Sequence, residues 1–599
     1  MKTLKMQFNL IGREVPIAQP SSACKRYVAF IHTTNMKRLS ILFFCLTINF
    51  FVFSNSYFVS NSTGNDSNNG TINFPWKTLM KVNATVFNIG DSVLFKRGEL
   101  WNGQLIISSS GNSIVPIFWG AYGTGNNPKI DGTGYSCTLK IPDREFIVVS
   151  SFEIISGIHG VFISGVISTG LIVLNDLSVH DPSSNNCITI QDRPNVTISN
   201  SELQNSASGG GISAYKSRGL SGGWSTLPCH NITVTNCYIH NNNSNGIYIA
   251  GHNAVIINNI IDNNGAYGMN PALHNIYLIG DNGIVKNNIL TNSPGGNGFR
   301  YEGSNLLITC NFIKNNERHG ISISNDFPDT LTNNRVFYNL IIGGSSNYGI
   351  LTYSSGTGLF DSIYIYNNSI YATTTNFTGL GLFNGSNIFL KNNIIDVKDK
   401  SIEISALCAN TLKSDYNCFH SERIDQLHLY NPYGGPTDIS LITWQTSGND
   451  LHSIEANPLF ANSPPDTTMD FNLTSSSNCI NSGEVLGLSS DFFGETIDNP
   501  PDIGGCEYTL ASYIISNFID KSDFILFPNP NSGSIAVKIQ EYKDYKYLKV
   551  IDVRGKEIYR QEIKSETILI DTNFLTQGIY IVCIMGFDGK YLTERFVKD

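Results

Sequence analysis

An asparagine motif recurs along the middle of the chain and limits the folds that the chain can adopt. The motif is asparagine, any residue, then a bulky apolar residue, and it returns about once every 25 residues. It begins at Asn175, Asn236, Asn259, Asn288, Asn311, Asn339, Asn368, Asn393 and Asn417, and Asn200 fills the widest gap less well. A period of this length indicates a stacked repeat architecture, in which each unit packs on its neighbours.

The residues within each repeat favour strands over helices. Short alternating segments such as 231–234, 246–249 and 254–257 are separated by Asn, Gly and Ser, and this region has no sustained helical apolar period. Three such strands and their turns fill one repeat. We therefore expect an all-β, right-handed parallel β-helix with coils stacked about 4.8 Å apart. An asparagine at each bend would hydrogen-bond along the stack.

Charge and cysteine content narrow the possible partners and cross-links. Only 15% of the 599 residues are charged and the net charge is −9, so no basic surplus indicates a nucleic-acid partner. We expect a monomer. Cysteines 229 and 237, 408 and 418, and 479 and 506 are near enough in sequence for disulfides. Cys237, Cys310 and Cys418, however, occupy apolar repeat positions that favour buried thiols.

The N-terminal region has the features of an export signal. Lys37 and Arg38 precede a mostly apolar run, 39–53, that ends in small polar residues, which is typical of a secretory signal peptide. We assign residues 36–56 to this signal peptide and residues 1–35 to an upstream extension. The alternative is a signal anchor with a cytoplasmic tail.

Both ends of the repeat region carry further motifs. The start, from Tyr57, contains Pro-Trp-Lys-Thr-Leu at 75–79 and Gly-Ala-Tyr-Gly at 120–123, and the end contains Asn-Pro-Leu-Phe at 457–460 and the segment 501–508. With the repeat, these motifs resemble the pectate-lyase-like β-helix proteins over residues 57–510. A short amphipathic segment at 76–86 would cap the first coil. The resemblance implies an enzyme acting on a polysaccharide, in a family of lyases, hydrolases and epimerases. The adjacent aspartates and Gly-His-Gly pattern of polygalacturonases are absent.

The C-terminal region forms a separate unit. After a linker at 511–523, residues 524–599 contain Phe-Pro-Asn-Pro-Asn-Ser-Gly, Val-Ile-Asp-Val-Arg-Gly-Lys-Glu and Leu-Thr-Gln-Gly-Ile-Tyr-Ile-Val in this order. Alternating strands with glycine turns predict a small β-sandwich. These three phrases and the closing Arg-Phe-Val-Lys at 595–598 resemble the type A C-terminal sorting domain of the type IX secretion system of Bacteroidetes. That resemblance implies the secretion machinery as a partner, removal of the domain, and a secreted or cell-surface protein; an immunoglobulin-like accessory module is the alternative.

The repeat also supplies a register for the outward side chains. In the strand that opens each coil, the apolar residue after the small residue points inward and alternate residues point outward. We take Ile188, Ile212, Ile247, Ile276, Phe299, Ile321 and Ile350 as equivalent. Three outward columns follow: Thr189, Ser213, Tyr248, Tyr277, Arg300, Ser322 and Leu351; Gln191, Tyr215, Ala250, Ile279, Glu302, Ser324 and Tyr353; and Arg193, Ser217, His252, Asp281, Ser304 and Asp326.

These columns gather chemically active side chains on one face. We expect the catalytic residues among Arg300, Tyr277, Tyr248, His252, Glu302 and Asp281, and substrate-binding residues at Tyr215, Lys216, His274 and His319. Asp281, Glu302 and Asp326 could hold a Ca²⁺ ion that bridges to the substrate. The structural alternative is that the tyrosines are surface packing, that His252 and His274 are turn residues, and that Arg300 and Glu302 form an exposed ion pair worth under about 1 kcal/mol.

Two reactions on a polysaccharide fit this set. In β-elimination on a uronic acid, Arg300 or Lys216 would neutralise charge or act as the base, and Tyr277, Tyr248 or His252 would move the proton. In an inverting hydrolase, Asp281 and Glu302, roughly 8 Å apart by sheet spacing, would flank the bond. We expect a polysaccharide lyase, with the hydrolase next. A non-catalytic, glycan-binding surface adhesin is a third hypothesis.

Overall fold

The computed structural model describes two regions of the chain. The first is residues 54–508, without 166–168, 218–227, 267–272, 345–346 and 432–434. The second comprises 524–527, 533–539, 542–552, 557–575, 578–587 and 591–598. The signal peptide expected at 36–56, up to residue 53, and the linker expected at 511–523 lie outside the described residues. Among the described residues, no helix is long and apolar enough to cross a membrane.

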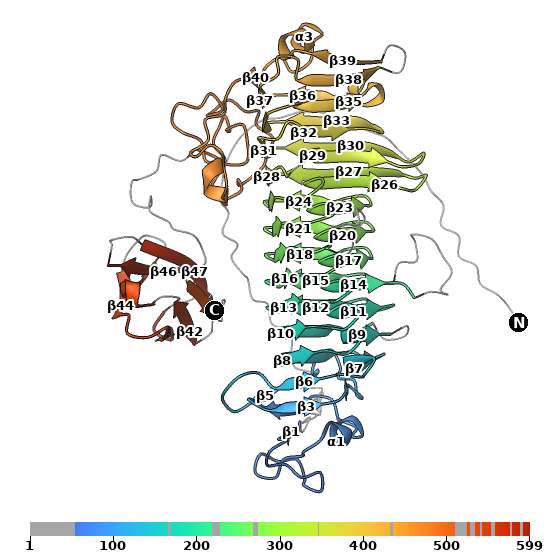
Figure 1. The fold of residues 1–599 in the computed structure, drawn as a ribbon, viewed down its shortest axis with the longest axis vertical. Helices are drawn as coiled ribbons and strands as arrows, with labels where there is room; N and C mark the ends of the chain where they lie inside the picture. Colours follow the sequence, from blue (N-terminus) through green and yellow to red (C-terminus); the bar gives the residue numbers. More distant parts are fainter. Residues whose placement is uncertain are drawn as a thin grey trace, which may run out of the picture. The chain divides into compact units, whose positions relative to one another are not determined.

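Parallel coils stack one on the next from β1 to β40, as the repeat predicts (Figure 1). One side of the coils is a 14-stranded sheet, which we call the site sheet. Its strands are parallel except β39, which returns antiparallel to β38. They are β4 (Leu105–Ile106), β7 (Cys137–Pro142), β9 (His159–Ser164), β11 (Ile188–Gln191), β14 (Ile212–Tyr215), β17 (Ile247–Ala250), β20 (Ile276–Ile279), β23 (Phe299–Glu302), β26 (Ile321–Asn325), β29 (Asn347–Ser354), β32 (Phe377–Leu382), β35 (Ile402–Ser405), β38 (Leu427–Asn431) and β39 (Gly435–Ile439).

The other sides of the coils form a second, 26-stranded sheet. Long strands such as β10 run along both of these sides, because β10 pairs with β12 and then with β13. The strands are β1 (Ser56–Val59), β2 (Ser92–Lys96), β3 (Leu100–Asn102), β5 (Ile117–Tyr122), β6 (Lys129–Asp131), β8 (Ile147–Ile155), β10 (Ile172–His180), β12 (Val196–Ser199), β13 (Glu202–Gln204), β15 (Ile232–Thr235), β16 (Tyr238–His240), β18 (Val255–Ile257), β19 (Ile260–Asp262), β21 (Ile284–Lys286), β22 (Ile289–Thr291), β24 (Leu307–Thr309), β25 (Phe312–Lys314), β27 (Thr330–Phe337), β28 (Leu340–Ile342), β30 (Leu359–Tyr366), β31 (Ser369–Ala372), β33 (Gly385–Lys391), β34 (Ile394–Val397), β36 (Lys413–Asp415), β37 (Cys418–His420) and β40 (Ile454–Glu455).

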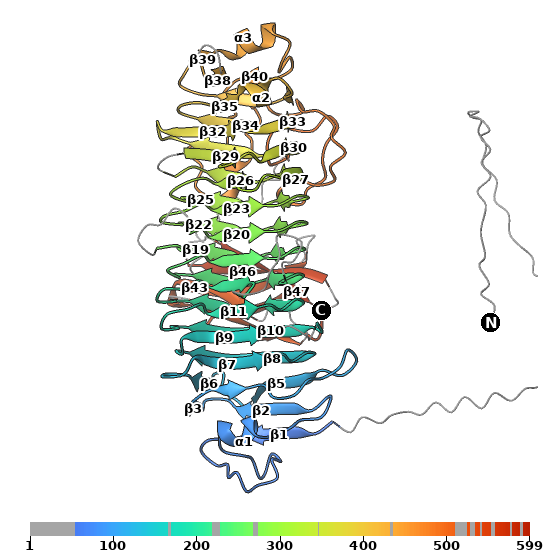
Figure 2. The same cartoon turned by 90° about the vertical axis from the view of Figure 1, so that its right-hand side faces the viewer.

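A short helix, α1 (Leu79–Asn83), covers the first coils (Figure 2). The Thr78 side chain accepts a hydrogen bond from the Lys81 amide (3.2 Å) and so caps its N-terminus. Leu79 and Val82 are buried in the solenoid core together with Trp76. The expectation of a capping segment at 76–86 is therefore met by this helix.

A buried asparagine ladder holds one corner of the coils together. Each ladder side chain before the last donates from Nδ2 to Oδ1 of the next asparagine along the stack at 2.9 to 3.0 Å, and that same Oδ1 also accepts a backbone N–H of the preceding coil. The members are Asn259, Asn288, Asn311, Asn339, Asn368, Asn393 and Asn417, each at most 1% exposed. The predicted ladder is confirmed for these seven coils.

The three coils that contain Asn175, Asn200 and Asn236 depart from the predicted ladder. Strand pairing aligns Tyr238 with Ile260, so Asn236 is equivalent to Asn258 and stands one position before the ladder. Asn200 likewise precedes it, and Asn175 is two positions early. Asn200, Asn236 and Asn258 have φ values of 50°, 54° and 61°, a conformation that asparagine tolerates well. The ladder position itself holds Leu177, Ser201 and Cys237.

Residues 456–508 fold back along the flank of the coils instead of extending the stack (Figure 1). Phe460, Phe471 and Leu473 pack on outward residues of the coils, including Phe312 and Leu340, in a second hydrophobic core. The Gly505 amide also donates to Ser369 Oγ (2.9 Å). The helical turns of this end of the chain are α2 (Ala406–Ala409), α3 (Leu441–Thr446) and the 3₁₀ turn η3 (Thr468–Phe471).

The C-terminal region forms two small antiparallel sheets around one core. The core takes Ile535 and Ile570 from one sheet and Val550, Val582 and Phe596 from the other, which is the predicted sandwich. The first sheet contains β41 (Phe524–Phe527), β42 (Ser534–Ile539) and β45 (Thr567–Asp571). The second contains β43 (Tyr545–Asp552), β44 (Glu557–Glu562), β46 (Gly578–Gly586) and β47 (Tyr591–Lys598), and η4 (Tyr542–Asp544) precedes β43.

The described cysteines are free thiols. All except the half-buried Cys310 are buried, so Cys237 and Cys418 are buried thiols as their apolar positions predict. None of the three near pairs in sequence forms a disulfide in the described part of the chain.

Candidate functional site

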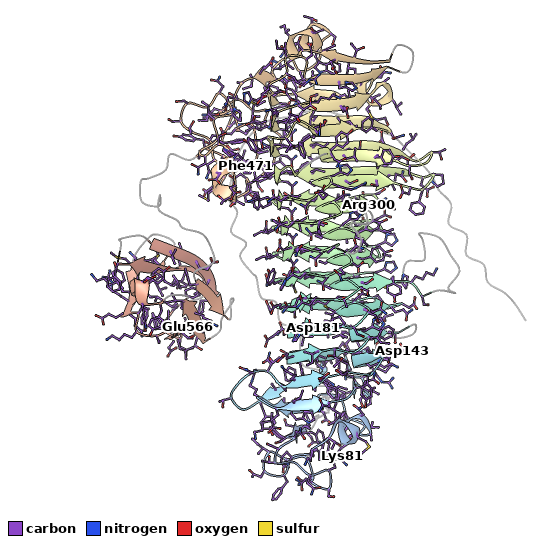
Figure 3. The ribbon with its side chains drawn as sticks, viewed as in Figure 1. Lys81, Asp143, Asp181, Arg300, Phe471 and Glu566 are labelled. Carbon is purple, nitrogen blue, oxygen red and sulfur yellow. The ribbon has the colours of Figure 1, made fainter. Side chains whose placement is uncertain are left out.

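Strand pairing confirms the register of the first two outward columns on the site sheet, whereas the third lies mostly beyond the strand ends, and its Arg193 is fully buried. Strands β17, β20, β23 and β26 pair so that Tyr248, Tyr277, Arg300 and Ser322 stand in register. Ile279 and Glu302 are likewise paired in the next column. Arg300 lies on the site-sheet side of the coils, whereas Phe471 lies on the opposite flank (Figure 3).

Tyr277, Arg300, Glu302 and Asp326 form one connected group, which we call the Tyr277 cluster. The Tyr277 hydroxyl donates to Glu302 Oε1 at 2.6 Å. Arg300 donates to that same oxygen from Nε (3.0 Å) and Nη2 (2.6 Å), and Nη2 also donates to Asp326 Oδ2 (2.7 Å). One nitrogen thus reaches both carboxylates, so their two oxygens lie within about 5.3 Å of each other.

Aromatic contacts fix the Tyr277 ring from two sides. The Arg300 guanidinium lies over the ring at 5.1 Å from its centroid, a cation–π geometry. The Tyr248 ring meets it edge-on at 5.4 Å. Glu302 at the hydroxyl, Arg300 over the ring face and Tyr248 beside the ring together hold Tyr277 in one orientation.

Burial controls the ionisation of this cluster. Glu302 is 2% exposed, and burial raises its pKa, although hydrogen bonds from Tyr277 and the positive charge of Arg300 act in the opposite direction. Burial, followed by the nearby charge of Glu302, raises the pKa of Tyr277 far above its ordinary value. Burial also raises the pKa of Tyr248. The resting cluster therefore contains a protonated phenol next to a carboxyl group that holds its proton more readily than usual.

His252 and Asp281 form a different network at the turn that follows their strands. His252 Nδ1 accepts from the Asp281 amide (2.9 Å) and lies 3.4 Å from Asp281 Oδ2. The Asp281 carboxylate accepts from the Ser304 amide (2.8 Å), and the His252 ring stacks on His230 at 5.1 Å. These contacts match the turn role considered for His252. Asp281 therefore contacts His252 and Ser304, whereas Glu302 contacts Tyr277 and Arg300.

His274 and His319 belong to a ladder that precedes the site-sheet strands. His274 Nδ1 accepts from the Asn297 amide (3.0 Å), and His319 Nδ1 accepts from the Tyr348 amide (3.3 Å). Burial, followed by nearby arginine charge, lowers the pKa of His274 to about 3; the same two effects lower that of His319 to about 4. Both rings are neutral at physiological pH, and His319 also lines a surface pocket.

Tyr215 and Lys216 lie farther along the same sheet. Tyr215 ends β14, the strand that pairs with β17, and Lys216 follows it. Burial raises the pKa of Tyr215, and the charge of Asp192 contributes. Residues 218–227, directly after this pair, lie outside the described residues.

The structure does not gather the carboxylates of the expected calcium site around one point. Among the described residues, no group of three or more His, Cys, Asp or Glu side chains could hold a metal ion. The physical reason is that Glu302 and Asp326 converge on Arg300, whereas Asp281 faces His252. The cation at the centre of the cluster is a guanidinium.

Two surface pockets lie beside the Tyr277 cluster, one lined by Arg300 and the other by Tyr277. A pocket of about 560 Å³ is lined by Arg300, Arg318, His319, Asp326 and Tyr348, among others. A second pocket of about 230 Å³ is lined by Ser213, Ser244, Tyr248 and Tyr277 with neighbouring backbone. Arg300 faces the first pocket and Tyr277 the second, with buried Glu302 behind both, so a ligand bound across the site would contact the cluster from each side.

Sequence reasoning missed Tyr348 and Arg318 in the first pocket. Tyr348 stands two residues before Ile350, at the position that His319 occupies before Ile321, so the repeat register contained the signal. Arg318 precedes that position, outside the strands, where strand alternation cannot predict the direction of a side chain.

Comparison with known proteins supports the fold and the C-terminal sorting domain. Residues 157–292 and 274–436 match the right handed beta helix region family, and residues 525–599 match the secretion system C-terminal sorting domain. No curated protein matches the chain.

Several solved structures are similar to the chain at low sequence identity. A GH136 lacto-N-biosidase from Eubacterium ramulus is 14% identical, covering 63% of this chain and 68% of that one, with a TM-score of 0.38. An alginate lyase from Paenibacillus sp. is 13% identical, covering 55% and 99%, with a TM-score of 0.36. A PL6 polysaccharide lyase from Pseudopedobacter saltans is 12% identical, covering 63% and 90%, with a TM-score of 0.30. Similarities this weak carry no argument about activity.

The coil register, the two family matches and the C-terminal sandwich agree with one another. A sorting domain of this kind indicates type IX secretion, to the cell surface or outside the cell. The chain is a right-handed parallel β-helix protein that ends in a secretion-system sorting domain.

Proposed function

We propose that this exported β-helix protein is a polysaccharide lyase that cleaves a uronic-acid-containing glycan by β-elimination at the Tyr277 cluster. The observation that carries the proposal is a phenol fixed between a buried carboxylate and a guanidinium, with a surface pocket beside each of Tyr277 and Arg300. Tyrosine rings pack against pyranose faces, and arginine and asparagine side chains bind sugar hydroxyls and carboxylates. The face combines these groups over several coils.

The geometry supports a specific proton path. Tyr277 takes the proton next to the uronate carboxylate as its own hydroxyl proton passes to Glu302 Oε1, 2.6 Å away. Arg300, over the ring, stabilises the negative charge that forms on the phenol oxygen and on the substrate. Tyr277 then protonates the departing glycosidic oxygen, and Glu302 returns the hydroxyl proton.

A hydrolase is the second candidate, with a different carboxylate pair from the one expected. Carboxylate oxygens of Glu302 and Asp326 share Arg300 Nη2 and lie at most about 5.3 Å apart, which is below the roughly 6.5 to 9.5 Å of inverting glycosidases and favours a retaining mechanism. The raised pKa of Glu302 also suits a general acid. Against this, Glu302 is 2% exposed beneath Tyr277 and Arg300, so its proton reaches substrate most directly through the phenol.

Product chemistry separates the candidates. The purified protein is incubated with a panel of uronate polymers, and ultraviolet absorbance of unsaturated uronides and new reducing ends are followed together. A lyase raises both signals, a hydrolase raises reducing ends alone, and an adhesin raises neither while retaining glycan.

Tyr277→Phe tests the proposed proton path. It keeps the ring and removes the hydroxyl, so kcat should fall by about a hundred-fold or more, with affinity for the polymer nearly unchanged. The matched control is Tyr364→Phe, on β30 of the second sheet, which should leave kcat unchanged. Full activity in Tyr277→Phe would rule out this role for the phenol.

A further inference from the structure

The charged side chains of the pocket of about 560 Å³ beside Arg300 determine which ligands it can bind. It is formed by side chains of β23, β26 and β29, of the segments that precede and follow these strands, and of the residues directly after β32, and its volume is in the range of small-molecule sites. Its anionic member is Asp326, which is already bound to Arg300. Arg300 in turn donates to two carboxylates. A second cation is therefore needed to recognise a substrate carboxylate without breaking the cluster.

Tyr348 forms a fixed aromatic wall of this pocket. Its hydroxyl donates to Glu403, which lies 55 residues further along the chain, on β35. To reach Glu403 the ring passes over Gly381, and a Cβ built at Gly381 would lie 2.6 Å from ring atom Cδ1. Real Cβ contacts are not this short, so the tyrosine occupies the space that the missing side chain leaves. The ring is also packed against His319 at 5.5 Å and Phe383 at 6.2 Å.

The partner of Tyr348 is an ionised carboxylate that is neutralised locally. Burial would raise the pKa of Glu403, but hydrogen bonds from Lys400 and Tyr348 outweigh it and lower that pKa. Lys400 Nζ lies 2.7 Å from Glu403 Oε1. Lys400 is thus engaged in an ion pair below the wall, and the hydroxyl of Tyr348 is anchored by a charged acceptor.

Arg318 is the cation of the pocket that is available to a ligand. It lines the pocket, its side chain is exposed, and no ion pair of Arg318 is found among the described residues. Its backbone is tied to the preceding coil, because its amide donates to the Gly296 carbonyl (3.0 Å). The neighbouring His319 is neutral, since burial and the charges of Arg318 and Arg300 lower its pKa. Arg318 and Tyr348 therefore line the same pocket.

We infer that Arg318 and Tyr348 form a subsite that binds an acidic sugar unit, with Arg318 pairing its carboxylate and Tyr348 packing against its ring. This rests on the proposed function for the neighbouring cluster and assigns the recognition of substrate charge to a residue other than Arg300. An arginine–carboxylate pair is commonly bidentate and charge-assisted. The subsite discriminates acidic from neutral glycans, whereas Arg300 stays committed to Glu302 and Asp326.

Equilibrium binding tests the subsite separately from catalysis. Calorimetry would measure the affinity of the full chain for oligosaccharides of several uronates and for the same oligosaccharides with their carboxyl groups reduced to alcohols. Arg318→Gln should raise Kd for the best acidic oligosaccharide about ten-fold or more and change Kd for its reduced form less than two-fold. Arg335→Gln on β27, an exposed arginine of the second sheet, is the matched control and should change neither.

Two further variants test the wall. Gly381→Ala should displace the Tyr348 ring and weaken binding of acidic and reduced forms alike, because it affects packing and leaves charge unchanged. Tyr348→Phe keeps the ring without its anchor and should weaken both forms less than Gly381→Ala does.

The outcomes separate the subsite from the proposed reaction. Binding that depends on Arg318 without any unsaturated product would uphold the subsite and overturn the lyase. Cleavage that is unchanged in Arg318→Gln, equal loss of acidic and reduced forms in that variant, or no binding of any uronate by the wild type would each overturn the subsite.

Discussion

Burial gives Glu302 an ionisation that differs from that of an ordinary glutamate. Glutamate in water has a pKa of about 4.3, and burial raises the pKa of Glu302 above its usual value. The proton path needs Glu302 ionised, because the carboxylate accepts the Tyr277 proton. Activity should therefore be present at high pH and be lost as the pH falls through the raised pKa of Glu302.

A pH profile of kcat/KM checks this. Its acid limb should lie above the ordinary glutamate value, and Glu302→Gln should remove most of the activity at every pH. An acid limb at or below the ordinary value would contradict the assigned role.

The strand register of the repeat predicted which residues share the site face. Hydrogen bonds in the structure determine which of these residues contact one another. The alignment of the inward apolar residues placed Tyr277, Arg300 and Glu302 in the correct register because strand alternation holds within β20 and β23. Beyond the strand ends alternation no longer applies, so nothing in the sequence directed Asp281 toward His252 or separated it from Glu302. His274 and His319 accept backbone N–H groups of the next coil, a role that composition alone does not reveal.

The asparagine ladder gives each coil part of its stability. Asn339 Oδ1 accepts from the Asn311 amide (3.1 Å) and from Asn311 Nδ2 (3.0 Å), and its own Nδ2 donates to Asn368 (3.0 Å). Asn339→Ala would leave buried polar groups of neighbouring coils without partners, at a cost of about 1 to 3 kcal/mol.

Chemical denaturation would measure that loss. Asn376→Ala, at an exposed asparagine, is the matched control and should change the free energy of unfolding by less than about 0.5 kcal/mol. Equal effects of the two substitutions would mean that the ladder contributes little to stability.

The ladder was predictable from Asn259 onward but not for the three coils that contain Asn175, Asn200 and Asn236. Asparagine serves two adjacent positions here: the buried ladder position and the positive-φ position before it. A motif of asparagine, any residue and an apolar residue cannot distinguish them, so Asn200 and Asn236 looked like ladder members. The pairing of β13, β16 and β19 resolves the ambiguity.

The whole chain combines an export domain with a scaffold that presents one continuous sheet face. The period of the repeat was enough to predict the β-helix, because each coil contacts mainly its neighbours. The return of residues 456–508 along the flank was not predictable from that period, because it depends on a second core between distant segments. The sorting domain was recognisable because its motifs are local in sequence.

The mass of the fragments released from a uronate polymer tests the central claim most directly. β-Elimination breaks the glycosidic bond without adding water, so one new end carries a double bond, whereas hydrolysis adds one water to each cleavage. We predict that the wild-type protein releases fragments with unsaturated ends, and that Tyr277→Phe releases almost none. Fragments that carry the additional water, or no fragments from any uronate polymer, would contradict the assignment of a lyase.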